Sequence, residues 1–340
     1  MAIEAPYWQL VQDLGHATTD AALAEDPDLG EILAAGERPS GDALSVALWL
    51  DEGAGYQDSD TTEFVPSAIL DAAISDDPEA ETLAVSGWTG IGSVATGDLA
   101  MLGDEFVRID GIGAAQVLVG RGCLDTVPRA HPSGTPLLIF GGRIAASEDS
   151  FATGQSIGVK LLPETAQGTI ALAAAPEDTV AMDARAIRPL PVGNYIIDGA
   201  FAPADVNALG TGSVLLEWAH RDRLAQTSAV LDDYTAGDIG PEPGVTYTVE
   251  IRWVDPNTGA ALDPPAAEIP VGTDTSYTLE AADVPPENEA PANTAQIEVA
   301  VRASREVDGS PRRDRGARAY RLTAPFALGW DKAWGINWGG

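Results

Sequence analysis

The feature that most constrains the fold is a strict alternation of apolar and polar residues in the last third of the chain. Three segments, near residues 214–218, 247–253 and 297–301, carry an apolar residue at every second position. These apolar residues are Val214, Leu216, Trp218, Tyr247, Val249, Ile251, Trp253, Ile297, Val299 and Val301. Because successive side chains of a strand point to opposite faces, the pattern predicts a β-sandwich over residues 205–323.

The middle of the chain, residues 81–185, has a different pattern of short apolar runs divided by glycine-containing turns. Strands are expected at 99–102, 106–109, 116–119 and 136–140, with further β segments at 156–172 and 179–190. Even spacing of short strands is typical of a small barrel or sandwich, so we expect a β-rich, barrel-like domain here.

The first 80 residues predict a helical and mixed region. Tyr7, Leu10, Val11 and Leu14 have helical spacing, and Gly15 is placed to end that helix. Further helices are expected at 19–23 and 29–35, followed by a buried strand at 43–50. A proline-containing connector, 186–204, and a tryptophan-rich tail, 324–340, complete the predicted organisation: a mainly β, multidomain protein.

Charge and cysteine content exclude several functions. The chain of 340 residues has 52 acidic and 19 basic residues, a formal net charge of −33. This charge argues against nucleic acid or an anionic membrane as a partner, and it favours a salty environment that screens self-repulsion.

The single cysteine, Cys123, excludes internal disulfides and a cysteine-based zinc site, and it is expected to be a small buried side chain. The N-terminus lacks the features of a secretory signal and no run of 18 apolar residues occurs, so assembly in the cytoplasm is expected.

The candidate catalytic residues have simpler interpretations. The histidines His16, His131 and His220 are far apart and lack metal-ligand spacing. The acidic pair Asp104-Glu105 could mimic a glycosidase pair, but 52 acids make such pairs inevitable by chance. The segment 58–62 resembles the opening of a calcium loop without its glycine and closing glutamate, so a solvated acidic loop is expected, with a weak cation site as the alternative. We therefore predict no enzyme activity, no catalytic or metal-binding residues and no cofactor.

Seven arginines concentrate near the end of the predicted sandwich, at 302, 305, 312, 313, 315, 318 and 321. One interpretation is a solvated hairpin loop. The other is a docking patch for an acidic surface of a neighbouring subunit, with Arg312, Arg313, Arg315 and Arg318 as candidates.

The C-terminal tail also leaves two interpretations open. It contains Phe326, Trp330, Trp334 and Trp338 among several glycines. So much aromatic surface is unusual at a free chain end, so the tail either folds back on its own sandwich or docks on another subunit.

Four stretches, taken in order, resemble one protein family. The first lies in residues 6–56 and includes Leu-Trp-Leu-Asp-Glu-Gly-Ala-Gly-Tyr. The second, in 97–135, includes Val-Gly-Arg-Gly-Cys-Leu-Asp-Thr-Val-Pro. The third, 187–199, includes Arg-Pro-Leu-Pro-Val-Gly-Asn-Tyr, and the fourth, 214–227, includes Glu-Trp-Ala-His-Arg-Asp-Arg. Together they are similar to the C-terminal half of the central hub, or host-specificity, proteins at the tail tip of siphophages and gene transfer agents.

This resemblance implies a structural virion protein at the distal end of a phage tail, in the tip or baseplate. It implies a fibronectin type III-like sandwich at 205–323, three copies around the tail axis, and contacts with hub, distal tail protein, fibres or a host receptor. It also implies a structural role for His220, as a hydrogen-bond partner of a neighbouring strand or loop. The family's N-terminal hub domains have no counterpart here, so a split tip protein is implied. Two alternatives remain: a receptor- or glycan-binding tail fibre module, and a tip-borne cell-wall hydrolase.

Overall fold

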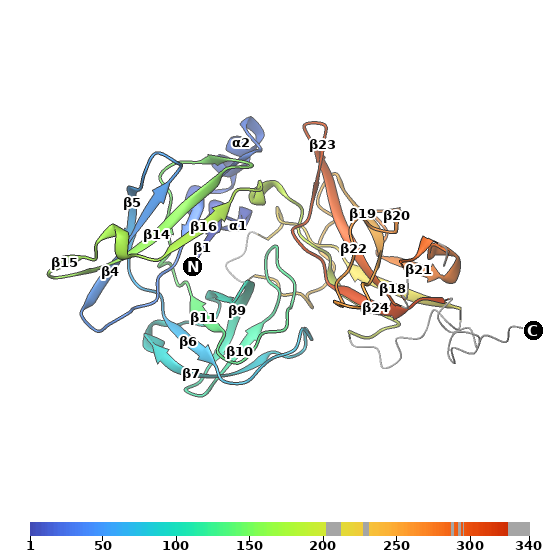
Figure 1. Ribbon diagram of the computed structural model, residues 1–340, viewed down its shortest axis with the longest axis horizontal. Helices are drawn as coiled ribbons and strands as arrows, with labels where there is room; N and C mark the ends of the chain where they lie inside the picture. Colours follow the sequence, from blue (N-terminus) through green and yellow to red (C-terminus); the bar gives the residue numbers. More distant parts are fainter. Residues whose placement is uncertain (202–211, 227–230, 287–288, 292–293, 295, 326–340) are drawn as a thin grey trace, which may run out of the picture. The chain divides into compact units, whose positions relative to one another are not determined.

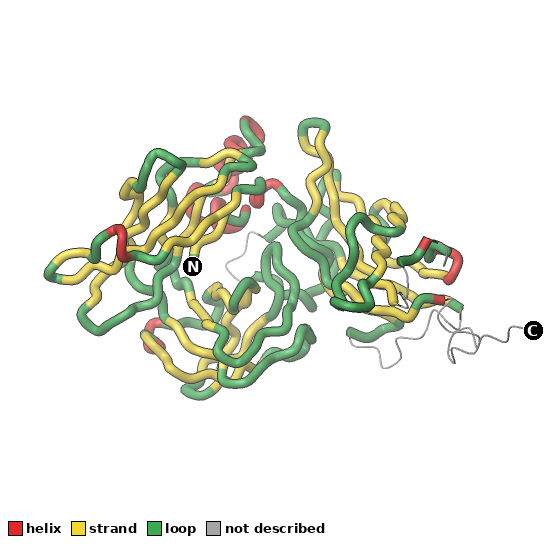
Figure 2. Tube along the Cα trace, viewed as in Figure 1, coloured by secondary structure: helices red, strands yellow, loops and turns green. Residues whose placement is uncertain are grey.

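A computed structural model describes residues 1–201, 212–226, 231–286, 289–291, 294 and 296–325. The chain divides into two compact units. Unit 1 contains residues 1–188 and 226–234, and unit 2 contains 189–225 and 235–340. Strands and loops make up most of the described chain (Figure 2). The short 3-10 helices are η1 (Ile91–Ser93), η2 (Leu172–Ala174), η3 (Arg185–Ile187) and η5 (Ala281–Asp283).

Three helices were predicted near the N-terminus of unit 1, and the structure contains two of them. Helix α1 (Tyr7–Leu14) buries Tyr7, Leu10 and Val11, and it ends at Gly15, whose positive φ of 82° suits a residue without a Cβ. Helix α2 (His16–Glu25) extends the second predicted helix. The third prediction, 29–35, is wrong, because this segment forms β2 (Leu29–Gly30) and β3 (Ile32–Ala34). Strand β3 is buried on both faces, so its apolar run has no period that separates strand from helix.

Strand β3 lies between β1 (Ala2–Glu4) and β12 (Ala145–Ala146), while β2 pairs with β13 (Phe151–Ala152). A larger antiparallel sheet has the order β15-β14-β4-β5, with β16 also paired to β14. Its strands are β4 (Ala43–Asp51), β5 (Gln57–Thr62), β14 (Ser156–Thr165), β15 (Gly168–Thr169) and β16 (Glu177–Ala181). The strand predicted at 43–50 is confirmed. The acidic loop predicted at 58–62 is wrong, because these residues belong to the polar strand β5.

Six strands of unit 1 close into an antiparallel barrel in the order β10-β7-β6-β11-β8-β9 (Figure 1). They are β6 (Ser67–Leu70), β7 (Thr82–Thr89), β8 (Leu99–Leu102), β9 (Glu105–Ile112), β10 (Gln116–Gly120) and β11 (Pro136–Ile139). Every strand supplies inward residues to one apolar core, among them Leu70, Val85, Leu102, Ile109 and Leu137. The barrel-like architecture and its four predicted strands are confirmed.

The predicted division of this region at residues 80 and 81 is wrong. Strand β6 precedes that boundary, yet it lies between β7 and β11 in the barrel. Strand β14 pairs with β4 from Gly158 opposite Asp51 to Thr165 opposite Ala43. Pairings between strands this far apart in sequence merge the two predicted regions into unit 1.

Unit 2 is a fibronectin type III-like sandwich. One sheet has the order β17-β18-β21, and the other has β20-β19-β22-β23, with β24 also paired to β22. The strands are β17 (Gly193–Ile197), β18 (Ser213–Ala219), β19 (Val245–Trp253), β20 (Ala267–Gly272), β21 (Ser276–Glu280), β22 (Gln296–Val307), β23 (Ser310–Arg313) and β24 (Ala319–Thr323). Aromatic rings join the sheets: Trp218 meets Tyr247 at a centroid distance of 6.2 Å, and Tyr195 meets Tyr320 at 4.9 Å.

The sandwich differs from the prediction in two places: it begins earlier in the chain, and one segment inside the predicted range belongs to unit 1. Its first strand, β17, lies inside the predicted connector 186–204 and buries Tyr195 completely. Residues 226–234, placed by sequence in the sandwich, belong to unit 1. The three apolar residues of β17 are consecutive, from Tyr195 to Ile197, so no apolar alternation distinguishes this strand from a connector.

Candidate functional site

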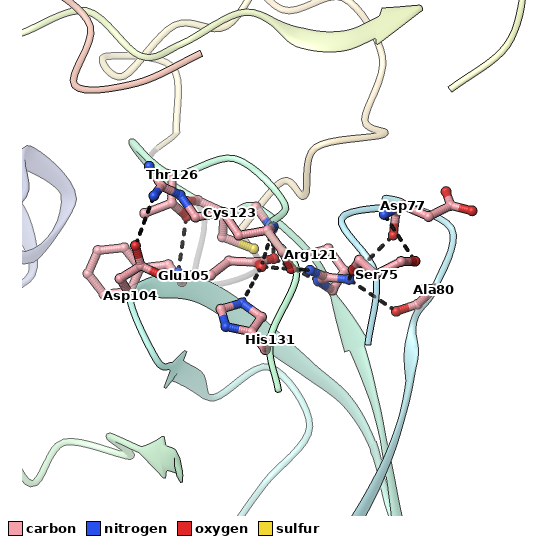
Figure 3. Close-up of polar contacts among 12 residues, drawn as sticks. Ser75, Asp77, Ala80, Asp104, Glu105, Arg121, Cys123, Thr126 and His131 are labelled. Atoms are coloured by element: carbon pink, nitrogen blue, oxygen red, sulfur yellow. Dashed lines mark hydrogen bonds and ion pairs between the residues drawn. The ribbon is translucent and has the colours of Figure 1, made fainter. Parts of the chain in front are cut away.

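A buried charge network lies at one end of the barrel, formed by Glu105, Arg121 and His131 (Figure 3). Glu105 begins β9, Arg121 follows β10, and His131 precedes β11. The Arg121 guanidinium donates through Nε to Glu105 Oε1 at 2.8 Å and through Nη2 to Oε2 at 2.7 Å. His131 Nε2 donates to Oε2 at 3.0 Å. The side chains of Glu105 and Arg121 are 0% exposed and that of His131 is 5% exposed.

Backbone groups complete the network. The amides of Gly122 and Arg129 each donate to the Glu105 carboxylate at 2.9 Å. Arg121 Nη1 donates to the carbonyls of Ser75 and Asp77 at 3.1 and 3.3 Å, and Nη2 donates to the carbonyl of Arg129 at 2.6 Å. Burial opposes ionisation of Glu105, but the donors from Arg121 and His131 outweigh it and hold the pKa of Glu105 below its usual value. The ion pair between Glu105 and Arg121 therefore fixes three loops, which contain Ser75 and Asp77, Gly122, and Arg129.

This arrangement suits a structural role better than catalysis. A substrate cannot reach a carboxylate whose side chain is fully buried and already accepts several hydrogen bonds. The neighbouring acid, Asp104, is 64% exposed and pairs with Arg129 at 3.1 Å. The two carboxylates of the Asp104-Glu105 pair therefore lie in different environments and do not form a joint acid–base site.

A second buried network joins Asp125, Arg185 and Glu4 within unit 1. Arg185 Nε and Nη2 donate to the Asp125 carboxylate at 2.7 and 2.8 Å, and the guanidinium lies 5.1 Å from the centroid of the Phe106 ring. Glu4 accepts from the amides of Asp183 and Arg185, both at 2.8 Å. Burial raises the pKa of Glu4 to about 7, against the lowering effect of these amides. The N-terminal strand is thus tied to the end of the first part of unit 1, residues 1–188.

In unit 2, the motif around Trp218 also forms internal contacts. His220 Nδ1 lies 2.8 Å from the Tyr247 hydroxyl of β19, and the His220 amide donates to Asp238 at 2.6 Å. Buried Glu242 accepts from Arg223 Nε at 2.9 Å and also pairs with Arg305. Burial raises the pKa of Tyr247. The contact expected between His220 and a neighbouring strand is confirmed.

The four candidate docking arginines differ in their surroundings. Arg313 pairs with Glu250 and with Glu268 of its own sandwich, the latter at 2.7 Å. Arg318 is 7% exposed and donates to the carbonyl of Phe201 at 2.8 Å. Arg312 is half-buried, whereas Arg315 is exposed in the segment between β23 and β24. Arg315 is thus the most exposed of the four candidates, and the docking role of the cluster stays a prediction. The other candidates, Phe326, Trp330, Trp334 and Trp338, lie outside the described residues.

A surface pocket that the sequence did not predict lies in unit 1, beside helix α1. It has a volume of about 360 Å³ and combines aromatic with polar residues. Helix α1 contributes Trp8, Gln9, Gln12 and Asp13, and the segments next to the barrel strands β8 and β11 contribute residues 97–99 and 140–142. Its components come from segments some 90 and 130 residues after α1, which is why no sequence motif marks it.

The described part of the chain contains neither a metal-binding cluster nor a helix that could span a membrane. In that part of the chain, no three His, Cys, Asp or Glu side chains come close enough to hold a metal ion. No helix there has the length and apolar character needed to span a membrane. Cys123 is fully buried, as predicted.

Comparisons with known proteins identify no family. No family model matches the chain, and no curated protein matches its sequence. Among solved structures, it is similar to the FN1–FN3 domains of chicken CNTN1, with 10% identity, a TM-score of 0.21, and coverage of 87% of this chain and 95% of that one. It is also similar to a cytokine receptor complex, with 12% identity, a TM-score of 0.17, and coverage of 88% and 93%. TM-scores this low carry no argument about how the chain works.

Proposed function

We propose that this protein is a structural component of the tail tip or baseplate of a long-tailed phage or phage-derived particle. The observation that carries the proposal is the ordered set of four stretches that resemble tail-tip hub proteins. Residues in these stretches take part in the buried networks that fix the fold. Glu105, Arg121 and Asp125 belong to the second stretch, and Trp218 and His220 belong to the fourth.

The placement of these residues supports a structural role over an enzymatic one. Breaking a buried ion pair costs several kcal/mol, so such pairs constrain which sequences can build the fold. Two of the three histidines, His131 and His220, are buried in hydrogen-bonded networks, and His16 lies 3.3 Å from the Tyr7 hydroxyl. We therefore propose that the protein is not an enzyme and needs no cofactor.

In the particle, this chain would link the tail hub to host-contacting parts, or contact the host itself. The proposed partners are the hub, the distal tail protein, fibres and further copies of the chain, with three copies around the tail axis. The exposed Arg315 and the tail 324–340 are the proposed docking elements. Arginine suits such a role in an acidic assembly, because its fork binds a carboxylate through two hydrogen bonds.

A receptor- or glycan-binding module remains a second candidate, favoured by the pocket beside α1. That pocket combines a half-buried tryptophan with amide and carboxylate side chains. Such a module could still belong to a tail tip. The two candidates therefore differ in the surface that binds a partner: the docking elements of unit 2 in the first, and the pocket beside α1 in the second.

The proposal is tested by replacing the gene with an Arg315→Glu variant in the strain that produces the particle. The matched control is Arg129→Glu, at an arginine of unit 1 whose side chain is 52% exposed and pairs with Asp104. We expect the first variant to leave the purified chain folded but to reduce its incorporation into tails at least tenfold. Normal incorporation of the first variant, or an equal loss in the control, would contradict docking through this cluster.

A further inference from the structure

The pocket beside α1 has the size and composition of a small-molecule site. Its volume of about 360 Å³ falls in the range of roughly 300–1,000 Å³ that is usual for ligand pockets. Apolar residues, including Trp8, Leu33, Leu99 and Phe140, form one part of its lining. Gln9, Gln12, Asp13 and Asp98 form the other part. Both an apolar and a hydrogen-bonding surface are therefore available to one ligand.

The aromatic part of the lining is held in position by the core. Trp8 is half-buried and packs against the cluster that contains Leu99, Phe106 and Phe140. Its indole ring therefore offers a fixed apolar surface at the pocket. An amphipathic ring of this kind suits a ligand with one apolar and one polar face.

The polar part is suited to a ligand rich in hydroxyl groups. Gln12 and Asp13 are exposed on α1, and Gln9 Nε2 donates to the Asp13 carboxylate at 3.1 Å. Carboxylates accept hydrogen bonds and amides both donate and accept, so this set can satisfy neighbouring hydroxyl groups. Asp98 Oδ2 already accepts from the Ala95 amide at 2.8 Å, which fixes the orientation of its carboxylate.

The barrel side of the pocket is held by backbone hydrogen bonds. The Phe140 amide donates to the Leu99 carbonyl at 2.9 Å, and the Arg143 amide donates to the Phe140 carbonyl at 2.8 Å. Between them, Gly141 and Gly142 have positive φ values of 48° and 75°. This conformation favours glycine, and it leaves backbone rather than side chains at that part of the lining.

Charge decides the class of ligand. Two carboxylates line the pocket, and the whole chain has a net charge of −33. The nearby cation, Arg143, pairs with Glu63 at 3.1 Å and donates to the Gly141 carbonyl at 3.3 Å. An anionic ligand would meet a repulsive field, whereas an uncharged one would not.

From these observations we propose that the pocket binds an uncharged pyranose sugar unit, with Trp8 against the apolar face of the ring and Gln12 and Asp13 bonded to its hydroxyls. This site deepens the second candidate function, the glycan-binding module, on which it rests, and it does not depend on the proposed structural role. Sugar binding by the isolated chain and incorporation into a particle are measured separately, so either can fail without the other.

The test uses the full chain and saturation-transfer NMR with three probes. Lactose and diacetylchitobiose are uncharged, and digalacturonic acid is anionic. We expect at least one uncharged probe to bind with a Kd of about 1 mM or lower, and digalacturonic acid to bind at least tenfold more weakly.

The variant Gln12→Ala/Asp13→Ala removes two exposed polar side chains and leaves the fold intact. It should weaken binding of the uncharged probe at least tenfold. The control Gln167→Ala/Glu25→Ala removes the same two kinds of side chain at exposed positions outside the pocket and should bind normally. The proposal is overturned if neither uncharged probe binds, if digalacturonic acid binds equally well, or if both double variants behave alike.

Discussion

Arg185 donates two parallel hydrogen bonds to the carboxylate of Asp125, 60 residues earlier in the chain, and both side chains are buried. Bidentate geometry of this kind is the strongest form of an arginine–carboxylate contact. The pair holds the loop after β10 against η3, near the end of the first part of unit 1. It therefore connects parts of the fold that no strand pairing joins directly.

Removing one member of this pair should destabilise unit 1. Asp125→Ala leaves the Arg185 guanidinium buried with its main partner lost, which costs about 3–5 kcal/mol. Asp104→Ala, at a 64% exposed side chain, should change the free energy of unfolding by less than about 0.5 kcal/mol. Urea unfolding monitored by circular dichroism measures both, and similar midpoints for the two variants would refute the proposed role of the pair.

Glu4 should make the stability of unit 1 depend on pH. Burial raises its pKa from 4.5 to about 7, so between these values the folded state binds more protons than the unfolded state. The contribution of Glu4 to stability is therefore complete below pH 4.5 and is lost as the pH rises toward 7. In Glu4→Gln this dependence should vanish, which unfolding at a series of pH values between 4.5 and 7 measures. An unchanged slope in the variant would show that Glu4 does not titrate in this range.

Truncation of Trp218 should unfold the sandwich, because this residue is 4% exposed and its ring meets Tyr247 across the two sheets. We expect Trp218→Ala to cost about 3–5 kcal/mol, and Trp253→Ala, at a residue 7% exposed, to cost a similar amount. Leu215 lies on the same strand as Trp218 but on its opposite face and is 38% exposed. Leu215→Ala should cost far less than either tryptophan variant. Differential scanning calorimetry of the three variants checks this order, and equal melting temperatures would rule out the assigned core.

The strands of this protein were predictable where short apolar runs ended at glycine turns. Residues 99–102 and 116–119 are such runs, and the structure places strands β8 and β10 there. Prediction failed at Ile32–Ala34, where burial on both faces removes the period, and at Gln57–Thr62, where no apolar residue marks the strand. Closure of the barrel through β6 and β11 depends on long-range pairing that local pattern does not encode.

The candidate sites were less predictable than the strands. Glu105 and Arg121 are ordinary charged residues in sequence, and only the return of β10 beside β9 brings them together. Trp8 and Phe140 line one pocket although 132 positions separate them. The burial of Trp218 and Trp253 was predictable from the apolar alternation around them, and that of Cys123 from the usual behaviour of a free cysteine as a small apolar residue.

The central claim is that this chain is part of a phage tail tip, and immunogold electron microscopy of purified particles tests it most directly. An epitope tag after Gln167, in the exposed turn between β14 and β15, keeps the label away from both buried charge networks. The account predicts gold particles at the distal end of tails and none on heads or in preparations from an untagged strain. Tagged chain that remains outside purified particles, or label on heads or along the tail shaft, would contradict the assignment.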